Sequence, residues 1–170
     1  MRAIGKGSLA SILAVGLHVT RVVLWIALGG ITFAIILMPF VPFIAGIFTG
    51  SDHINIDGDI ESGDFFEVTH AFVNTIVMLF VVNRLLEILK TLRFGSPFVK
   101  ENADRFRTVG YALLIGEGAK FAFGFLSILF DAEIDIDFSF ISWLAIIAVL
   151  VLSEVFREGA RMKEEQDLTV

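Results

Sequence analysis

Four long apolar segments separated by short polar connections make up most of the chain. They run over residues 22–48, 65–82, 108–130 and 138–153. Each is close to or above the roughly 17 to 20 residues with which an α-helix crosses a hydrocarbon core of about 30 Å. With their more polar extensions, the pattern predicts helices at about 9–48, 65–93, 102–130 and 138–163. The expected fold is therefore all-α, a four-helix transmembrane bundle in one integral membrane domain over residues 1–170.

Two of the predicted helices have irregular ends. Pro39 and Pro42 remove backbone donors and disfavour helix before them, so residues 38–48 should kink or leave the helix. The second helix overshoots its apolar run until Gly95 ends it and Pro97 prevents it from resuming. We call residues 95–102 the elbow.

The connections at the opposite ends of these helices alternate between apolar and polar residues. Residues 53–57 and 133–138 place Ile or Phe at every second position, which is typical of half-buried strands. We expect them to form a small extracytoplasmic β element that caps the bundle, because an isolated two-stranded ribbon is marginal in water.

The charges are segregated along the chain. Ten acids and no Lys or Arg lie in the two outer connections: Asp52, Asp57, Asp59, Glu61, Asp64, Glu67, Asp131, Glu133, Asp135 and Asp137. Lys and Arg instead gather near both termini and around the elbow. The positive-inside rule therefore predicts that both termini and the elbow are cytoplasmic.

Composition narrows the chemistry further. The mean hydropathy is +0.82 and apolar residues make up 56% of the chain, too much for an ordinary soluble domain. With no Cys there is neither a disulfide framework nor a thiolate metal site. The segment 57–61 is only weakly similar to a Ca²⁺ loop and fits solvated turn acids as well. No catalytic motif or nucleic-acid footprint is present, so we expect no enzyme, no cofactor, no resident metal and no direct nucleic-acid partner.

Glu117 and Lys120 are the strongest candidates for chemistry inside the membrane. They lie roughly 15 and 20 Å along the third helix from Arg107. A lone charge at the bilayer centre costs at least about 2.5 kcal/mol, so the two should pair and face other helices. The pair is either a proton or ion relay, a polar ligand site, or a structural ion pair that fixes helix packing.

His70 and Asn74 share one face of the second helix, with Asn74 at about the depth of Lys120. We therefore expect an intramembrane polar cluster of His70, Asn74, Glu117 and Lys120. His70 is either a pH switch, since imidazole titrates near physiological pH, or an interfacial hydrogen-bonding group.

Three stretches carry a family resemblance. They are Gly95-Ser96-Pro97-Phe98-Val99 followed by Asn102, then residues 105–110, and the tail at 158–170 with its acidic end. The chain resembles the bacterial family called domain of unknown function 2975, whose members are small four-helix proteins of the inner membrane. In many genomes such genes adjoin one for a small helix-turn-helix regulator, so the resemblance implies that kind of partner.

Residue chemistry gives the elbow and tail a role of their own. Phe98 should fall back onto the bundle, and Asn102 should cap the following helix. The tail should be helical as far as its last charges and then fray, leaving Glu165, Asp167 and Leu168 to contact a partner.

Three functions fit these features, and the large share of cytoplasmic motifs favours the first. The first is a non-enzymatic signalling protein of the inner membrane that holds the regulator through its elbow and tail. The second is a small transporter or ion- or proton-coupled protein that uses Glu117 and Lys120 and forms a homo-oligomer around a path. The third is a structural scaffold in membrane lipid.

Overall fold

The computed structural model describes residues 9–43, 62–94, 97–130 and 139–168, and these residues are almost entirely helical. Helix α1 spans Leu9–Leu37 and passes into the 3₁₀ helix η1 at Met38–Phe40. The other long helices are α3 at Ser62–Phe94, α4 at Lys100–Leu129 and α5 at Phe140–Asp167. No strand occurs in the described residues, and the segments predicted to form a β element, 53–57 and 133–138, lie outside them.

All four long helices are apolar enough to cross a membrane, so the protein is a multi-pass membrane protein. Large apolar side chains project outward from all four, as in Ile26 of α1, Met78 of α3, Ile115 of α4 and Ile147 of α5. Such exposure would be unfavourable in water, but in a bilayer these side chains meet lipid.

The prolines shape the end of the first helix as predicted. The α-helix stops at Leu37 and tightens to a 3₁₀ turn that has Pro39 in its first positions. Proline lacks an N–H donor and clashes with the preceding turn, so the regular ladder of hydrogen bonds is interrupted there before helical geometry resumes at residues 41–43.

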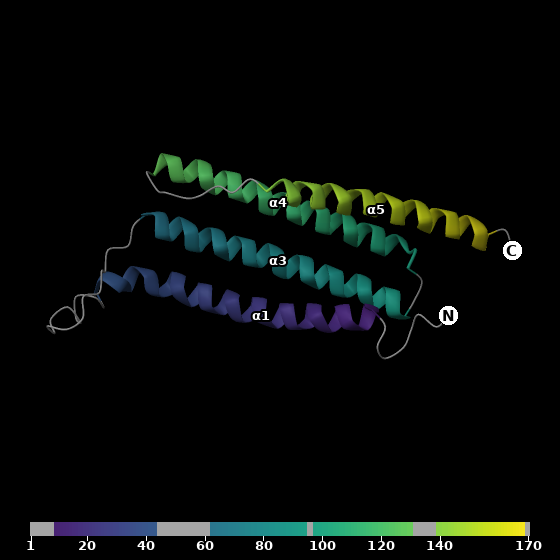
Figure 1. Cartoon of the computed structure of the whole chain (residues 1–170), viewed down its shortest axis with the longest axis horizontal. Coiled ribbons are helices and arrows are strands. Elements are labelled where there is room, and N and C mark those ends of the chain that lie inside the picture. Colours follow the sequence, from purple (N-terminus) through teal and green to yellow (C-terminus); the bar gives the residue numbers. More distant parts are fainter. Residues whose placement is uncertain (1–8, 44–61, 95–96, 131–138, 169–170) are drawn as a thin grey trace.

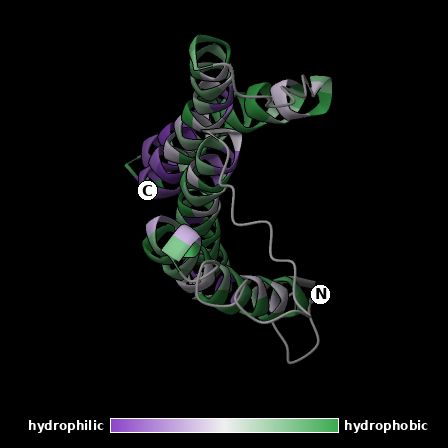
Figure 2. Cartoon of the chain, turned by 90° about the vertical axis from the view of Figure 1, so that its left-hand side faces the viewer, coloured by the Kyte–Doolittle hydropathy of each residue, from purple (hydrophilic) through white to green (hydrophobic). Residues whose placement is uncertain are grey.

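The predicted all-α fold with four long apolar helices is confirmed, and the four helices form an open curved layer. They lie antiparallel in chain order, α1 beside α3, α3 beside α4 and α4 beside α5 (Figure 1). Viewed along the helices, the layer is an arc with hydrophilic residues gathered near the C-terminal end of α5 (Figure 2). Lipid is as apolar as the outer helix faces, so no hydrophobic force draws α1 and α5 together to close the ring.

The tightest packing lies between α3, α4 and α5. Val81, Val109 and Ala112 are buried together, with Val149 of α5 against them. A Cβ added to Gly110 would lie 2.5 Å from Leu150, so this glycine lets α5 approach α4 closely. Helix α1 is attached along one face to α3, and Ala14 is its only buried residue among those described.

We call one end of the layer the basic end. It contains the α3–α4 connection and the last turns of α5. Helix α5 continues four residues past the predicted position 163, because ion pairs link its successive turns. Arg157 pairs with Glu154, and Arg161 pairs with Glu158 at 2.7 Å and with Glu165 at 3.5 Å. Pairs at these spacings favour a helix even in water.

Candidate functional site

A cavity with four polar residues in an otherwise apolar wall lies within the membrane-spanning part, between α3, α4 and α5. Its volume is about 200 Å³, and its polar lining residues are Asn74, Glu117, Lys120 and Ser142. Glycine at position 116 lets α3 approach, since a Cβ there would meet Val77 at 3.3 Å. We call these four polar residues and the space between them the intramembrane cavity.

Glu117 and Lys120 form the expected ion pair. Lys120 Nζ lies 2.9 Å from Glu117 Oε1, and the two side chains are 28% and 11% exposed. Burial strengthens their attraction and makes an unpaired charge costly. The ammonium group has three donors and gives one to Glu117, so the others are available toward the cavity.

The structure brings three of the four predicted cluster residues together. Asn74, Glu117 and Lys120 line one cavity, and Ser142 of α5 joins them. His70 does not line it; its ring packs edge-on against Phe123 of α4, with the centroids 5.7 Å apart. Its role as a pH switch stays a prediction.

Asn102 belongs to a second polar site at the basic end and does not cap α4. The helix begins two residues earlier than predicted, at Lys100, and Val99 occupies the N-cap position without a side-chain hydrogen bond. Asn102 is fully buried within the first turn, where its amide Nδ2 donates to the carbonyl of Pro97 at 3.0 Å. It thus closes the elbow from inside.

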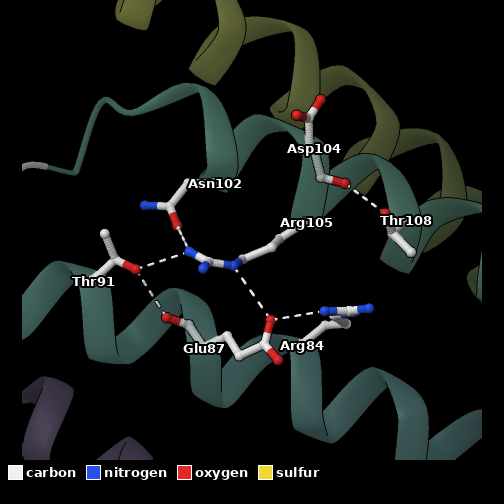
Figure 3. A network of polar contacts seen from close by, with 7 residues as sticks. All are labelled: Arg84, Glu87, Thr91, Asn102, Asp104, Arg105 and Thr108. Carbon is white, nitrogen blue, oxygen red and sulfur yellow. Dashed lines mark hydrogen bonds and ion pairs between the residues drawn. The ribbon is translucent and has the colours of Figure 1, made fainter.

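Arg105 links this elbow to α3 (Figure 3). Its guanidinium donates to Asn102 Oδ1 and to Thr91 Oγ1, both at 2.9 Å, and its Nε lies 3.3 Å from Glu87 Oε2. The same Glu87 oxygen accepts from Arg84 at 2.9 Å. We call Arg84, Glu87, Thr91, Asn102 and Arg105 the basic-end network.

The contacts of Arg84, Glu87 and Thr91 with the elbow network were not predicted. Their spacing held a usable signal, because positions 84, 87 and 91 share one helical face. Arg105 meets this face because α3 and α4 pack side by side. The spacing of residues within one helix does not determine how two helices pack.

Phe98 falls back onto α5, as predicted. Its ring packs against Phe156 with the centroids 5.5 Å apart, and the ring of Phe106 also packs against Phe156, with the centroids 4.9 Å apart. A Cβ on Gly159 would lie 2.6 Å from the Phe98 ring, so the lack of a side chain at this glycine makes room for the ring. The elbow is thereby fixed to both α3 and α5. Pro97 contributes its carbonyl, and Gly95 lies outside the described residues.

The predicted tail residues remain helical and accessible. Glu165 and Asp167 are exposed on the last turn of α5, and Leu168 is its C-cap, 86% exposed. The last turn of α5 therefore exposes two acidic side chains followed by the apolar side chain of Leu168.

The arrangement offers ion pairs, amides and hydroxyls, and no cluster of three or more His, Cys, Asp or Glu that could hold a metal occurs among the described residues. Comparison with known families then gives a match: the family described as "Protein of unknown function (DUF2975)" covers residues 67–170. The chain belongs to this family. The matched residues include the intramembrane cavity and the basic-end network but not α1. No curated protein and no solved structure matches the chain.

Proposed function

We propose that this DUF2975 protein is a non-enzymatic regulatory protein of the bacterial inner membrane. Its basic end faces the cytoplasm, and there the elbow and the last turns of α5 hold a small helix-turn-helix transcription regulator. One observation carries the proposal. Helix α5 extends beyond its apolar run, and this extension packs against the elbow and ends in acidic residues.

The α5 extension is long enough to serve as a docking element. From Glu154 to Asp167 it reaches roughly 20 Å beyond the apolar segment, at 1.5 Å per residue. Phe98 of the elbow packs against Gly159 near the middle of this extension, so the extension is held in place against the elbow. A fixed helix loses less conformational entropy on binding than a mobile tail.

The charges at the tip suit a basic partner. Arg157 and Arg161 are engaged by acids within α5, whereas Glu164 and Asp167 form no ion pair among the described residues. A DNA-binding regulator carries a cationic face for phosphates. An acidic turn that covers this face would steer the regulator to the membrane and hold it off DNA.

The intramembrane cavity supplies a place where the signal would enter. Its walls belong to α3, α4 and α5, so an occupant would change how α5 lies on α4. About 22 Å of α4 separates Asn102 from Glu117, and one continuous helix joins them. Such a helix transmits a displacement from the cavity to the elbow and the α5 extension.

The test is copurification in mild detergent with the small helix-turn-helix protein encoded by an adjoining gene, together with transcription of its targets. Removing residues 164–170, or the double change Glu164→Lys/Asp167→Lys, should release the regulator and alter transcription. The matched control is Asp104→Lys, which reverses one exposed acid of α4 outside the elbow and is compared with Glu164→Lys alone. Retention of the regulator by the tail variants would reject the tail contact, and its absence from the full-length preparation would reject this function.

The cavity also supports a second candidate, a small transporter or ion- or proton-coupled protein. Asn74, Glu117 and Lys120 together form the kind of polar group that marks pathways in membranes. An open layer of four helices does not enclose a path, so this function requires a homo-oligomer. In proteoliposomes, Glu117→Gln should abolish the transport of ions, protons or solute while folded protein is retained. Unchanged transport would mean that the Glu117–Lys120 pair takes no part in it.

A further inference from the structure

A second cavity, of about 610 Å³, lies between α1 and α3 near the basic end. This volume is within the roughly 300 to 1,000 Å³ typical of small-ligand sites. Its lining is amphipathic. Apolar walls come from both helices, and the polar residues are His18 and Arg21 of α1 with Asn83, Arg84, Glu87 and Lys90 of α3.

The cationic groups outweigh the single acid in this lining. Glu87 already accepts from Arg84 at 2.9 Å and lies 3.3 Å from Arg105 of α4, so two guanidinium groups share its charge. Arg21 and Lys90 form no ion pair within the described part of the chain. The cavity therefore presents an excess of positive charge to whatever enters it.

The position of the cavity places these charges at a membrane surface. Arg21 directly precedes the apolar run of α1, and Arg84 follows the apolar run of α3. Exposed Val22, Trp25 and Ile26 continue along α1 toward the membrane interior. A ligand with an anionic head in the cavity would thus have an apolar surface beside it for its chains.

We propose that this cavity binds the phosphate headgroup of an anionic phospholipid. Basic pockets between helices at the membrane surface suit such headgroups, because a bilayer supplies the phosphate and the acyl chains together. Arg21 and Lys90 supply the charge, with His18 and Asn83 as hydrogen-bonding groups. Because α1 lies outside the residues matched by the family, the site is argued from this chain's own α1–α3 contact.

The experiment uses the full chain with Trp143→Phe, which leaves Trp25 as the single tryptophan, one turn beyond Arg21. The protein is placed in phosphatidylcholine vesicles that contain brominated phosphatidylglycerol or, separately, brominated phosphatidylcholine. Quenching of Trp25 by the two lipids gives their relative association constant. We expect phosphatidylglycerol to be preferred, and Arg21→Gln/Lys90→Gln to lower that preference roughly thirtyfold, because two basic residues at the membrane surface are lost.

Two control variants distinguish the loss of this site from a general loss of positive charge and from misfolding. Arg157→Gln/Arg161→Gln removes the same charge from the exposed face of α5 and should keep the preference. Arg21→Lys/Lys90→Arg keeps the cations and should keep it too. Equal quenching by both lipids in the unaltered site, or an undiminished preference in Arg21→Gln/Lys90→Gln, would overturn the proposal. If inorganic phosphate binds the protein in phosphatidylcholine vesicles, as measured by titration calorimetry, and phosphatidylglycerol shows no preference, the ligand is free phosphate and the lipid assignment is wrong.

Discussion

At the scale of single residues, charged side chains within the membrane survive because they are paired. Glu117 and Lys120 lie 2.9 Å apart on α4 beside Asn74, so each charge has a partner in a region that excludes water. Removing one member of such a pair costs more than replacing both, since the remaining charge stays buried.

This asymmetry gives the first prediction. Glu117→Gln should lower the stability of the detergent-solubilised protein by about 2.5 kcal/mol or more, the cost of a lone charge at this depth. The double variant Glu117→Gln/Lys120→Met should lose much less. Thermal unfolding followed by size-exclusion chromatography measures both. Equal losses would mean that the two charges act independently.

Phe98 and Gly159 give a second prediction at the residue scale. Alanine in a helix is favoured over glycine by about 0.5 to 1 kcal/mol, but a Cβ at 159 would lie 2.6 Å from the Phe98 ring. Gly159→Ala should therefore destabilise the protein, and it should become stabilising when Phe98→Ala removes the ring. Gly118, with open space around it, is the control, because Gly118→Ala meets no neighbour. If Gly159→Ala changes the stability equally with Phe98 and with Phe98→Ala, the Phe98 ring does not pack against Gly159.

At the scale of elements, the elbow is held by side chains from three helices. Asn102 closes it through Pro97, Arg105 ties it to α3 through Thr91 and Glu87, and Phe98 ties it to α5. The buried asparagine is the centre of this arrangement because it both donates to the elbow and accepts from Arg105.

Replacing Asn102 should loosen the elbow while the membrane-spanning helices persist. Asn102→Leu removes both hydrogen bonds and leaves the Pro97 carbonyl without its side-chain donor, at a cost of about 1 to 3 kcal/mol. Hydrogen exchange at the start of α4 should accelerate, and exchange near Val109 should not. Lys100→Gln, which changes an exposed residue in the same turn, should leave both rates unaltered. Protection that is unchanged in Asn102→Leu would show that the network does not hold the elbow.

At the scale of the whole molecule, the antiparallel layer places the start of α3 and the end of α5 at opposite ends (Figure 1). Because the chain has no cysteine, single cysteines can report which end faces the cytoplasm. Ser62→Cys should react with a membrane-impermeant thiol reagent in intact spheroplasts, and Glu164→Cys only after lysis. The reverse labelling pattern would invert the orientation and remove the tail from the reach of a cytosolic regulator.

The sequence by itself determined the elements and the pairing within them. Four apolar runs of membrane-spanning length gave four helices, Pro39 interrupted the first, and the spacing of Glu117 and Lys120 gave their ion pair. These features depend on residues near one another in the chain, where helical periodicity fixes the neighbours. The same local reasoning placed Phe98 back on the helices but misplaced the role of Asn102, because the start of α4 shifted by two residues.

Tertiary structure decided everything that depends on how the helices meet. Apolar helix faces suit lipid and other helices equally, so the pattern could not tell an open layer from a closed bundle. The crossing of α3 and α4 joined Arg105 to Glu87 and Thr91, and the approach of α5 added Ser142 to the cavity of Asn74, Glu117 and Lys120. The cationic cavity between α1 and α3 likewise exists only because the two polar helix ends lie side by side.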